Sequence, residues 1–195
     1  MSVLLSMAGF ALAASISPGP VNLVALSSGA RFGLRASLRH VTGATLGFTL
    51  LLLALGLGLQ QLLSQWPALA ALIRWSGVAF LLYMACCLAL DEGRLAGGAA
   101  LRAPSLFTGA LMQWLNPKAW LAALAGMSAY AADGDLGVVG QFAALYFLIC
   151  YLSIACWAYA GAFLGAYLKS PRRMRLFNRS LAALLVGSAA YLLWP

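Results

Sequence analysis

The chain has 195 residues, of which 64% are hydrophobic and 8% charged, and it carries a formal net charge of +8. Soluble domains carry roughly a quarter charged residues, so this composition excludes a soluble fold and predicts an integral membrane protein that lies in a lipid bilayer. The positive residues lie in short loops between apolar segments, so the net positive charge does not require a nucleic-acid partner.

Six apolar segments approach or exceed the roughly 20 residues that a helix needs to cross a hydrocarbon core. They lie at about 3–30, 41–63, 67–90, 105–130, 138–168 and 180–195. The last segment is short, so its helix is expected either to begin earlier, near Arg175, or to lie in a locally thinned bilayer. We therefore expect an all-α integral membrane protein, with six transmembrane helices in a single domain of residues 1–195.

The first segment is interrupted by Pro18-Gly19-Pro20. A proline inside a helix removes a backbone donor, so the carbonyls of Ala14 and Ile16 lose their helical partners. Asn22 stands beside this break, and its amide can both donate and accept hydrogen bonds. Irregular backbone survives in lipid only where protein or a water-filled cavity surrounds it, so we expect this break to serve the function.

Positive residues gather in alternate loops along the chain. The loops at 31–40, 91–104 and 169–179 hold Arg31, Arg35 and Arg39, then Arg94 and Arg102, and then Lys169, Arg172, Arg173, Arg175 and Arg179. Positive residues mark the cytoplasmic side, so both termini are predicted to lie outside. Arg74 and Lys118 do not fit this pattern. The single histidine, His40, lies in the first basic loop and is expected to be solvated.

The fourth segment contains the second break, in FTGALMQWLNPKAW. Pro117 frees the carbonyl of Gln113, and Asn116 stands beside it as Asn22 does beside the first break. Lys118 follows at membrane depth, where an ionisable residue is by default a functional hypothesis. The carboxylate of a substrate is one candidate partner. The alternatives are that Lys118 snorkels to an interface or bonds the carbonyls freed at the first break.

The two broken segments also resemble each other, as FALAASISPGPVNLVALSSGA and FTGALMQWLNPKAWLAALAGM. With three spans in each half, a first repeat of about 1–90 and a second of about 105–195 enter the membrane from opposite sides. Inverted repeats with paired broken helices are typical of secondary transporters. A substrate would be held between the breaks while the two three-helix halves rock about it.

Several chemistries are not expected. No Asp or Glu lies within a span, so a cationic substrate or a metal ion would lack a countercharge, and a neutral zwitterion is favoured. We find no set of catalytic residues, no phosphate loop and no cysteine spacing typical of a metal site, so neither an enzyme nor a cofactor is predicted. The glycine pairs Gly43/Gly47 and Gly161/Gly165 indicate close helix packing, with a homodimer face as the alternative.

A family resemblance rests on SPGPVNLVALSSGARFG, GATLGF, YMA, FTGALMQWLNPKAW and NRSLAALLVG. Together these segments resemble the LysE/RhtB family of amino-acid exporters over nearly the whole chain. The resemblance implies a bacterial inner-membrane protein of six spans that exports amino acids, with protons as the exchanged ion. Because acidic residues are missing from the spans, the chain is more similar to the homoserine/threonine-type branch than to the branch for basic amino acids. No intramembrane carboxylate is available to carry the proton.

The sequence thus predicts an exporter of neutral amino acids or close derivatives that works by proton antiport and alternating access. The alternatives are an exporter of another small metabolite and an accessory membrane protein that transports nothing. The predicted substrate-binding residues flank the two breaks: Pro18, Gly19, Pro20, Asn22, Gln113, Asn116, Pro117 and Lys118.

Overall fold

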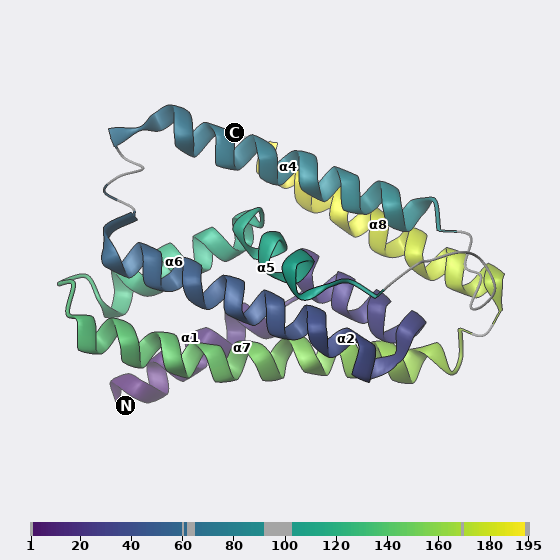
Figure 1. The fold of residues 1–195 in the computed structure, drawn as a ribbon, viewed down its shortest axis with the longest axis horizontal. Helices are drawn as coiled ribbons and strands as arrows, with labels where there is room; N and C mark the ends of the chain where they lie inside the picture. Colours follow the sequence, from purple (N-terminus) through teal and green to yellow (C-terminus); the bar gives the residue numbers. More distant parts are fainter. Residues whose placement is uncertain (1, 60, 62–64, 92–102, 169, 194–195) are drawn as a thin grey trace.

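The computed structural model describes residues 2–59, 61, 65–91, 103–168 and 170–193, and its regular elements there are all helices (Figure 1). These are α1 (Val3–Ile16), α2 (Pro20–Ala54), the π-helical turn η1 (Leu55–Leu59), α4 (Pro67–Ala89), α5 (Leu106–Trp114), α6 (Pro117–Tyr130), α7 (Leu136–Gly165) and α8 (Pro171–Leu193). Arg94, Arg102 and Lys169 lie outside the described residues, as does the side chain of Arg74.

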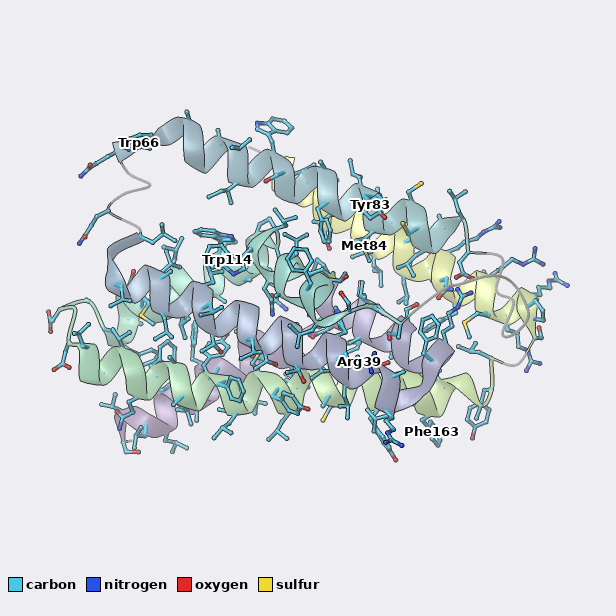
Figure 2. The ribbon with its side chains drawn as sticks, in the orientation of Figure 1. Arg39, Trp66, Tyr83, Met84, Trp114 and Phe163 are labelled. Carbon is cyan, nitrogen blue, oxygen red and sulfur yellow. The ribbon has the colours of Figure 1, made fainter. Side chains whose placement is uncertain are left out.

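Three stretches in the described part of the chain are long and apolar enough to cross a membrane: Pro20–Leu59, Ala71–Ala89 and Leu136–Gly165. Large apolar side chains cover the outside of the bundle. Figure 2 shows Trp66 and Phe163 at its periphery, where they are 62% and 60% exposed. Such a surface suits contact with hydrocarbon.

Both predicted helix breaks are confirmed. α1 ends at Ile16 and α2 begins at Pro20, while α5 ends at Trp114 and α6 begins at Pro117. Each new helix thus starts with a proline in its first turn, where the missing N–H has no helical acceptor to lose. Each interrupted segment thus consists of two helices joined by a short non-helical link, residues 17–19 in the first and 115–116 in the second.

The predicted first basic loop at 31–40 is wrong, because its residues are helical apart from one sharp turn. Gly33 has φ 77° and ψ 169°, a left-handed conformation that glycine adopts without steric cost. The Oγ atoms of Ser28 and Ser37 lie 2.7 Å apart although the residues are nine positions apart. A straight helix would separate them by about 13 Å. The chain therefore doubles back at Gly33, and α2 comprises two helical segments.

Two further expectations need correction. His40 is not solvated but 0% exposed, since the turn at Gly33 brings it back beside the first segment of α2, with Nε2 3.4 Å from the carbonyl oxygen of Val21. The last helix begins at Pro171, ahead of the expected start near Arg175. Arg172, Arg173, Arg175 and Arg179 therefore lie on the first turns of α8 instead of in a loop.

α2 packs closely along both α5 and α7. A side chain at Gly43 would collide with the backbone of Leu106, and one at Gly161 with the backbone of Leu26. A side chain at Gly47 or Gly165 would also collide, with the backbones of Ala110 and Ala30, although these approaches are less close. The predicted role of these four glycines in helix packing is thus confirmed, since they let backbones approach where no hydrophobic effect drives association.

The core falls into two clusters. The larger one joins α1, α2, α5, α6 and α7 around buried residues such as Phe48 and Tyr146. The smaller one joins α4 and α8 through Leu81, Leu185 and their neighbours, and it reaches α2 at Leu23 and Leu26. α4 and α8 lie side by side along one side of the molecule (Figure 1). They form a two-helix unit, which we call the α4–α8 arm, that covers the first segment of α2.

Candidate functional site

The carbonyls that the first break frees are bonded by side chains. Ser17 Oγ donates to the carbonyl of Ala14 at 3.1 Å, and Trp157 Nε1 donates to that of Ile16 at 3.0 Å. Asn22 Nδ2 donates to the carbonyls of Ser15 and Ser17, both at 2.9 Å. Unpaired backbone groups cost free energy in lipid, so these hydrogen bonds stabilise the irregular backbone inside the membrane.

The second break is closed by Asn116. Its Oδ1 caps α6 by accepting a hydrogen bond of 3.2 Å from the backbone amide of Lys118. The backbone amide of Asn116 donates to the freed carbonyl of Gln113, also at 3.2 Å. Trp120 Nε1 donates to the carbonyl of Trp114 at 2.7 Å. The ring of Trp114, labelled in Figure 2, meets that of Trp120 edge to face. Asn116 is thus a buried N-cap.

Lys118 joins the two breaks. Its Nζ donates to the carbonyl of Ser17 at 2.7 Å, to Ser17 Oγ at 2.8 Å and to the carbonyl of Pro18 at 3.1 Å. An ammonium has three donors, so all of them are used. The start of α6 is an unfavourable place for a cation, but the side chain carries its charge to the carbonyl end of α1, where a cation is stabilised. In this conformation Lys118 bonds carbonyls at the first break, as the alternative reading expected, but they are those of Ser17 and Pro18 and not those of Ala14 and Ile16.

Two cavities meet at this junction. The smaller has a volume of about 40 Å³ and lies among α1, α2, α5, α6 and α7. The larger, about 470 Å³, lies between the two breaks and the α4–α8 arm. Gly19, Asn116 and Lys118 line both cavities. The structure therefore places the bridge made by Lys118 between an inner cavity and a groove.

All eight predicted site residues line one cavity or the other. The inner cavity takes Gly19, Asn22, Gln113, Asn116 and Lys118, and the groove takes Pro18, Gly19, Pro20, Asn116, Pro117 and Lys118. Among the described residues that line them, Lys118 alone carries a charge at neutral pH.

Other residues of the site were not predicted. Phe48, Tyr146 and Ile154 form an apolar wall of the inner cavity, and the rings of Phe48 and Tyr146 lie 4.5 Å apart. Ser15 also lines this cavity, and Ser17 supplies two of the three acceptors of Lys118. The two serines stand within three residues of Pro18, so their nearness to the break was a usable signal. Nothing in the sequence marks Phe48 or Tyr146.

The two new helices differ at their amino ends. Asn116 caps α6, whereas Gly19 precedes α2 without a side-chain cap. Pro20 has no N–H, so the first unbonded amides of α2 belong to Val21 and Asn22, which both line the inner cavity. Uncapped amides at a helix start attract a carboxylate. The inner cavity thus offers anion donors at the start of α2, and Lys118, which also lines it, is bonded to the carbonyls of Ser17 and Pro18.

Apolar helices that are broken in pairs, with a cation between the breaks, define a membrane transporter. Comparison with known proteins agrees with this class. Residues 12–194 match the family model of the LysE type translocator. The chain belongs to this family.

Curated relatives cover most of the chain. A cysteine/O-acetylserine efflux protein of Escherichia coli (strain K12) is 29% identical over 183 residues, which cover 92% of each chain. Proteins with the same name from Shigella flexneri and Escherichia coli O1:K1 / APEC are 29% and 28% identical over the same shares of both chains. No solved structure matches the chain.

Proposed function

We propose that the protein exports a neutral amino acid or a close derivative of one across the inner membrane of a bacterium, by alternating access and in exchange for protons. One observation carries this proposal: Lys118 joins the two breaks, and a cavity lies on each side of its side chain. The efflux of cysteine and O-acetylserine by relatives supports a small, uncharged side chain in the substrate.

The substrate would lie in the inner cavity across the two breaks. Its carboxylate would accept from the amides of Val21 and Asn22 at the uncapped start of α2. Its ammonium would donate to the carbonyls of Ser17 and Pro18. The side chain would face Phe48, Tyr146 and Ile154, the apolar wall of the inner cavity.

Six spans in two inverted repeats fit the arrangement of the helices. In the first repeat the spans would be α1 with the first segment of α2, the second segment of α2, and α4. In the second they would be α5 with α6, then α7, then α8. Equivalent pairs support this reading, since α1 packs on α7 as α5 packs on α2, and the third spans α4 and α8 pack on each other.

The helix packing does not favour a movement in which the two three-helix halves rock against each other. α2 of the first half is locked to α5 and α7 of the second by backbone contacts at Gly29, Gly43 and Gly161. The α4–α8 arm has a core of its own, and the groove lies between it and the breaks. We therefore infer that the arm moves against the other helices.

The proposed orientation has both termini outside, and an ion pair joins two positions that this orientation places on the same side of the membrane. Arg31 near the turn at Gly33 pairs with Asp91 after α4, and both positions were assigned to the cytoplasmic side. A homodimer remains a prediction. The glycines that suggested one are occupied by contacts within the chain.

The test is the uptake of labelled amino acids into everted membrane vesicles, with and without an imposed pH gradient. The panel contains cysteine, O-acetylserine, threonine, homoserine, leucine and lysine. We expect uptake of at least one neutral amino acid that depends on the gradient and is absent from vesicles without the protein. If no amino acid accumulates although the protein is inserted, the proposal is refuted, and a copurifying partner would then favour an accessory role.

A further inference from the structure

The ammonium of Lys118 occupies the acceptors that a substrate ammonium would need. Its three bonds end on the carbonyl of Ser17, on Ser17 Oγ and on the carbonyl of Pro18. All three acceptors follow the end of α1, and they hold the side chain of Lys118, which lines both cavities. In the structure the ammonium of Lys118 is bonded to these oxygens. In the substrate-bound site the ammonium of the substrate would be bonded to them instead.

We propose that Lys118 carries the coupling proton, and that its protonated form and the substrate ammonium compete for the carbonyls of Ser17 and Pro18. This inference rests on the proposed function, because it describes the coupling of the same site. It answers how a chain without a carboxylate in its predicted spans can exchange a substrate for a proton. Competition for one site is what antiport requires, since substrate and proton must then cross in alternate steps.

The surroundings of Lys118 favour such a competition. No acidic side chain lines either cavity among the described residues, so nothing there would neutralise two adjacent cations. The titratable groups that face Lys118 across the inner cavity are Tyr146 and Cys150 of α7. α4 and α8 face it across the groove with Leu81, Leu184 and Ser188, which do not titrate. Two ammonium groups in this low-dielectric space repel, so the arrival of one expels a proton from the other.

The position of Gly19 fits this role. A side chain there would lie 3.0 Å from Cδ of Lys118 and 3.1 Å from its Nζ. Lys118 thus reaches the carbonyls by passing directly over Gly19, and the absence of a side chain leaves it a path to swing away. A residue that must leave its acceptors in each cycle needs such a path.

The proton balance of one cycle is simple. When the site faces the cytoplasm, a zwitterion binds, one N–H bond of the Lys118 ammonium breaks, the electron pair stays on Nζ, and the proton passes to cytoplasmic water. When the site faces outside, the zwitterion leaves and Nζ takes a proton from outer water. Each cycle therefore exports one neutral zwitterion and imports one proton, and net positive charge moves inward.

Calorimetric titration of the full-length protein in micelles with L-cysteine, under reducing conditions, tests the inference. Titrations in buffers of different ionisation enthalpy give the number of protons released, and titrations from pH 5.5 to 7.5 give the pH dependence of Kd. For the wild type we expect about one proton per bound cysteine and a Kd that falls about tenfold per unit of rising pH.

Three variants sharpen the test. Lys118→Gln should bind without proton release and with a Kd that varies less than about twofold over the same pH range, since it cannot titrate. Lys118→Arg keeps a fixed cation on the carbonyls, so it should bind more weakly at every pH without releasing a proton. Lys169→Gln, the same change at the chain's other lysine, should release the proton as the wild type does.

The outcomes separate this inference from the proposed function. Cysteine binding to the wild type without proton release, or proton release that persists in Lys118→Gln, would overturn the role of Lys118 and leave export intact. The wild-type measurements decide this even if the variants do not fold. A wild type that neither binds cysteine nor transports any amino acid of the vesicle panel would refute the proposed function, and the coupling with it.

Discussion

The indole of Trp157 in α7 donates a hydrogen bond of 3.0 Å to the carbonyl of Ile16, the last residue of α1. One helix of the second half thus satisfies a carbonyl that the first break sets free. Trp157→Phe keeps the apolar ring but leaves that carbonyl unpaired, so we expect a loss of about 1–3 kcal/mol in the free energy of unfolding.

Equilibrium unfolding in mixed micelles measures this loss. Trp75→Phe is the matched control, because Trp75 is 58% exposed on the outside of the bundle. Its effect should stay within about 0.5 kcal/mol. Equal effects of the two substitutions would show that the bond to Ile16 contributes nothing particular.

Gly43→Ala should prevent correct packing of α2 on α5. The added methyl group would collide with the backbone of Leu106, which cannot move aside as a side chain would. We expect poor accumulation in the membrane and a lower melting temperature in detergent. Gly9→Ala is the control, since nothing lies within 4 Å of its added carbon. It should be neutral or stabilise α1 by about 0.5–1 kcal/mol.

Asn116→Ala removes the side chain that caps α6 and that also lines both cavities. It should destabilise the protein by about 1 kcal/mol and lower the rate of amino-acid transport. Ser105→Ala removes a comparable cap from α5, where Ser105 Oγ accepts from the amide of Thr108 at 3.1 Å, but far from either cavity. It should cost similar stability and transport normally. Parallel transport losses in both variants would argue against a role of Asn116 in the site.

The ion pair between Arg31 and Asp91 should tie the α4–α8 arm to α2. The two side chains are 13% and 9% exposed, so a like-charge pair there is poorly screened. Arg31→Asp should lower transport and cost about 1–3 kcal/mol of stability, and Arg31→Asp with Asp91→Arg should recover part of both. Arg35→Asp, at an exposed neighbouring position, is the control. A double variant no better than the single one would show that the pair itself does not matter.

The predicted topology can be tested with reporter fusions. Alkaline phosphatase fused after Pro195 should be active, and green fluorescent protein at the same place should be dark, because the carboxyl terminus is expected outside. Fusions after Asp91 should give the opposite pattern. Fluorescence of the full-length fusion would reverse the assigned orientation.

The sequence allowed the two breaks to be placed because proline acts locally: Pro18, Pro20 and Pro117 end helices whatever surrounds them. A reversal was predicted at residues 31–40, but nothing in the sequence showed that it would shrink to a single turn at Gly33 between two helical segments. The error at His40 has the same origin, because its burial depends on that turn.

The site shows the same limit. The eight residues beside the breaks were predicted because they are close to the prolines in sequence. Trp157, Phe48 and Tyr146 reach the breaks only through the packing of α7 and α2, which no local pattern encodes. The role of Lys118 stayed open for a similar reason, since its acceptors lie at the first break, about a hundred residues earlier in the chain.

The pairing of α4 with α8 has a consequence for how the protein is made. α4 ends at Ala89, and its partner begins only at Pro171, so the ribosome completes α5, α6 and α7 before the face of α4 that carries Leu81 can be covered. Until α8 is synthesised, that face meets lipid or the insertion machinery. The last step of biogenesis, the arrival of the carboxyl-terminal helix, would then close the groove beside the breaks, so that a truncated or stalled chain would leave this side of the site open to the bilayer.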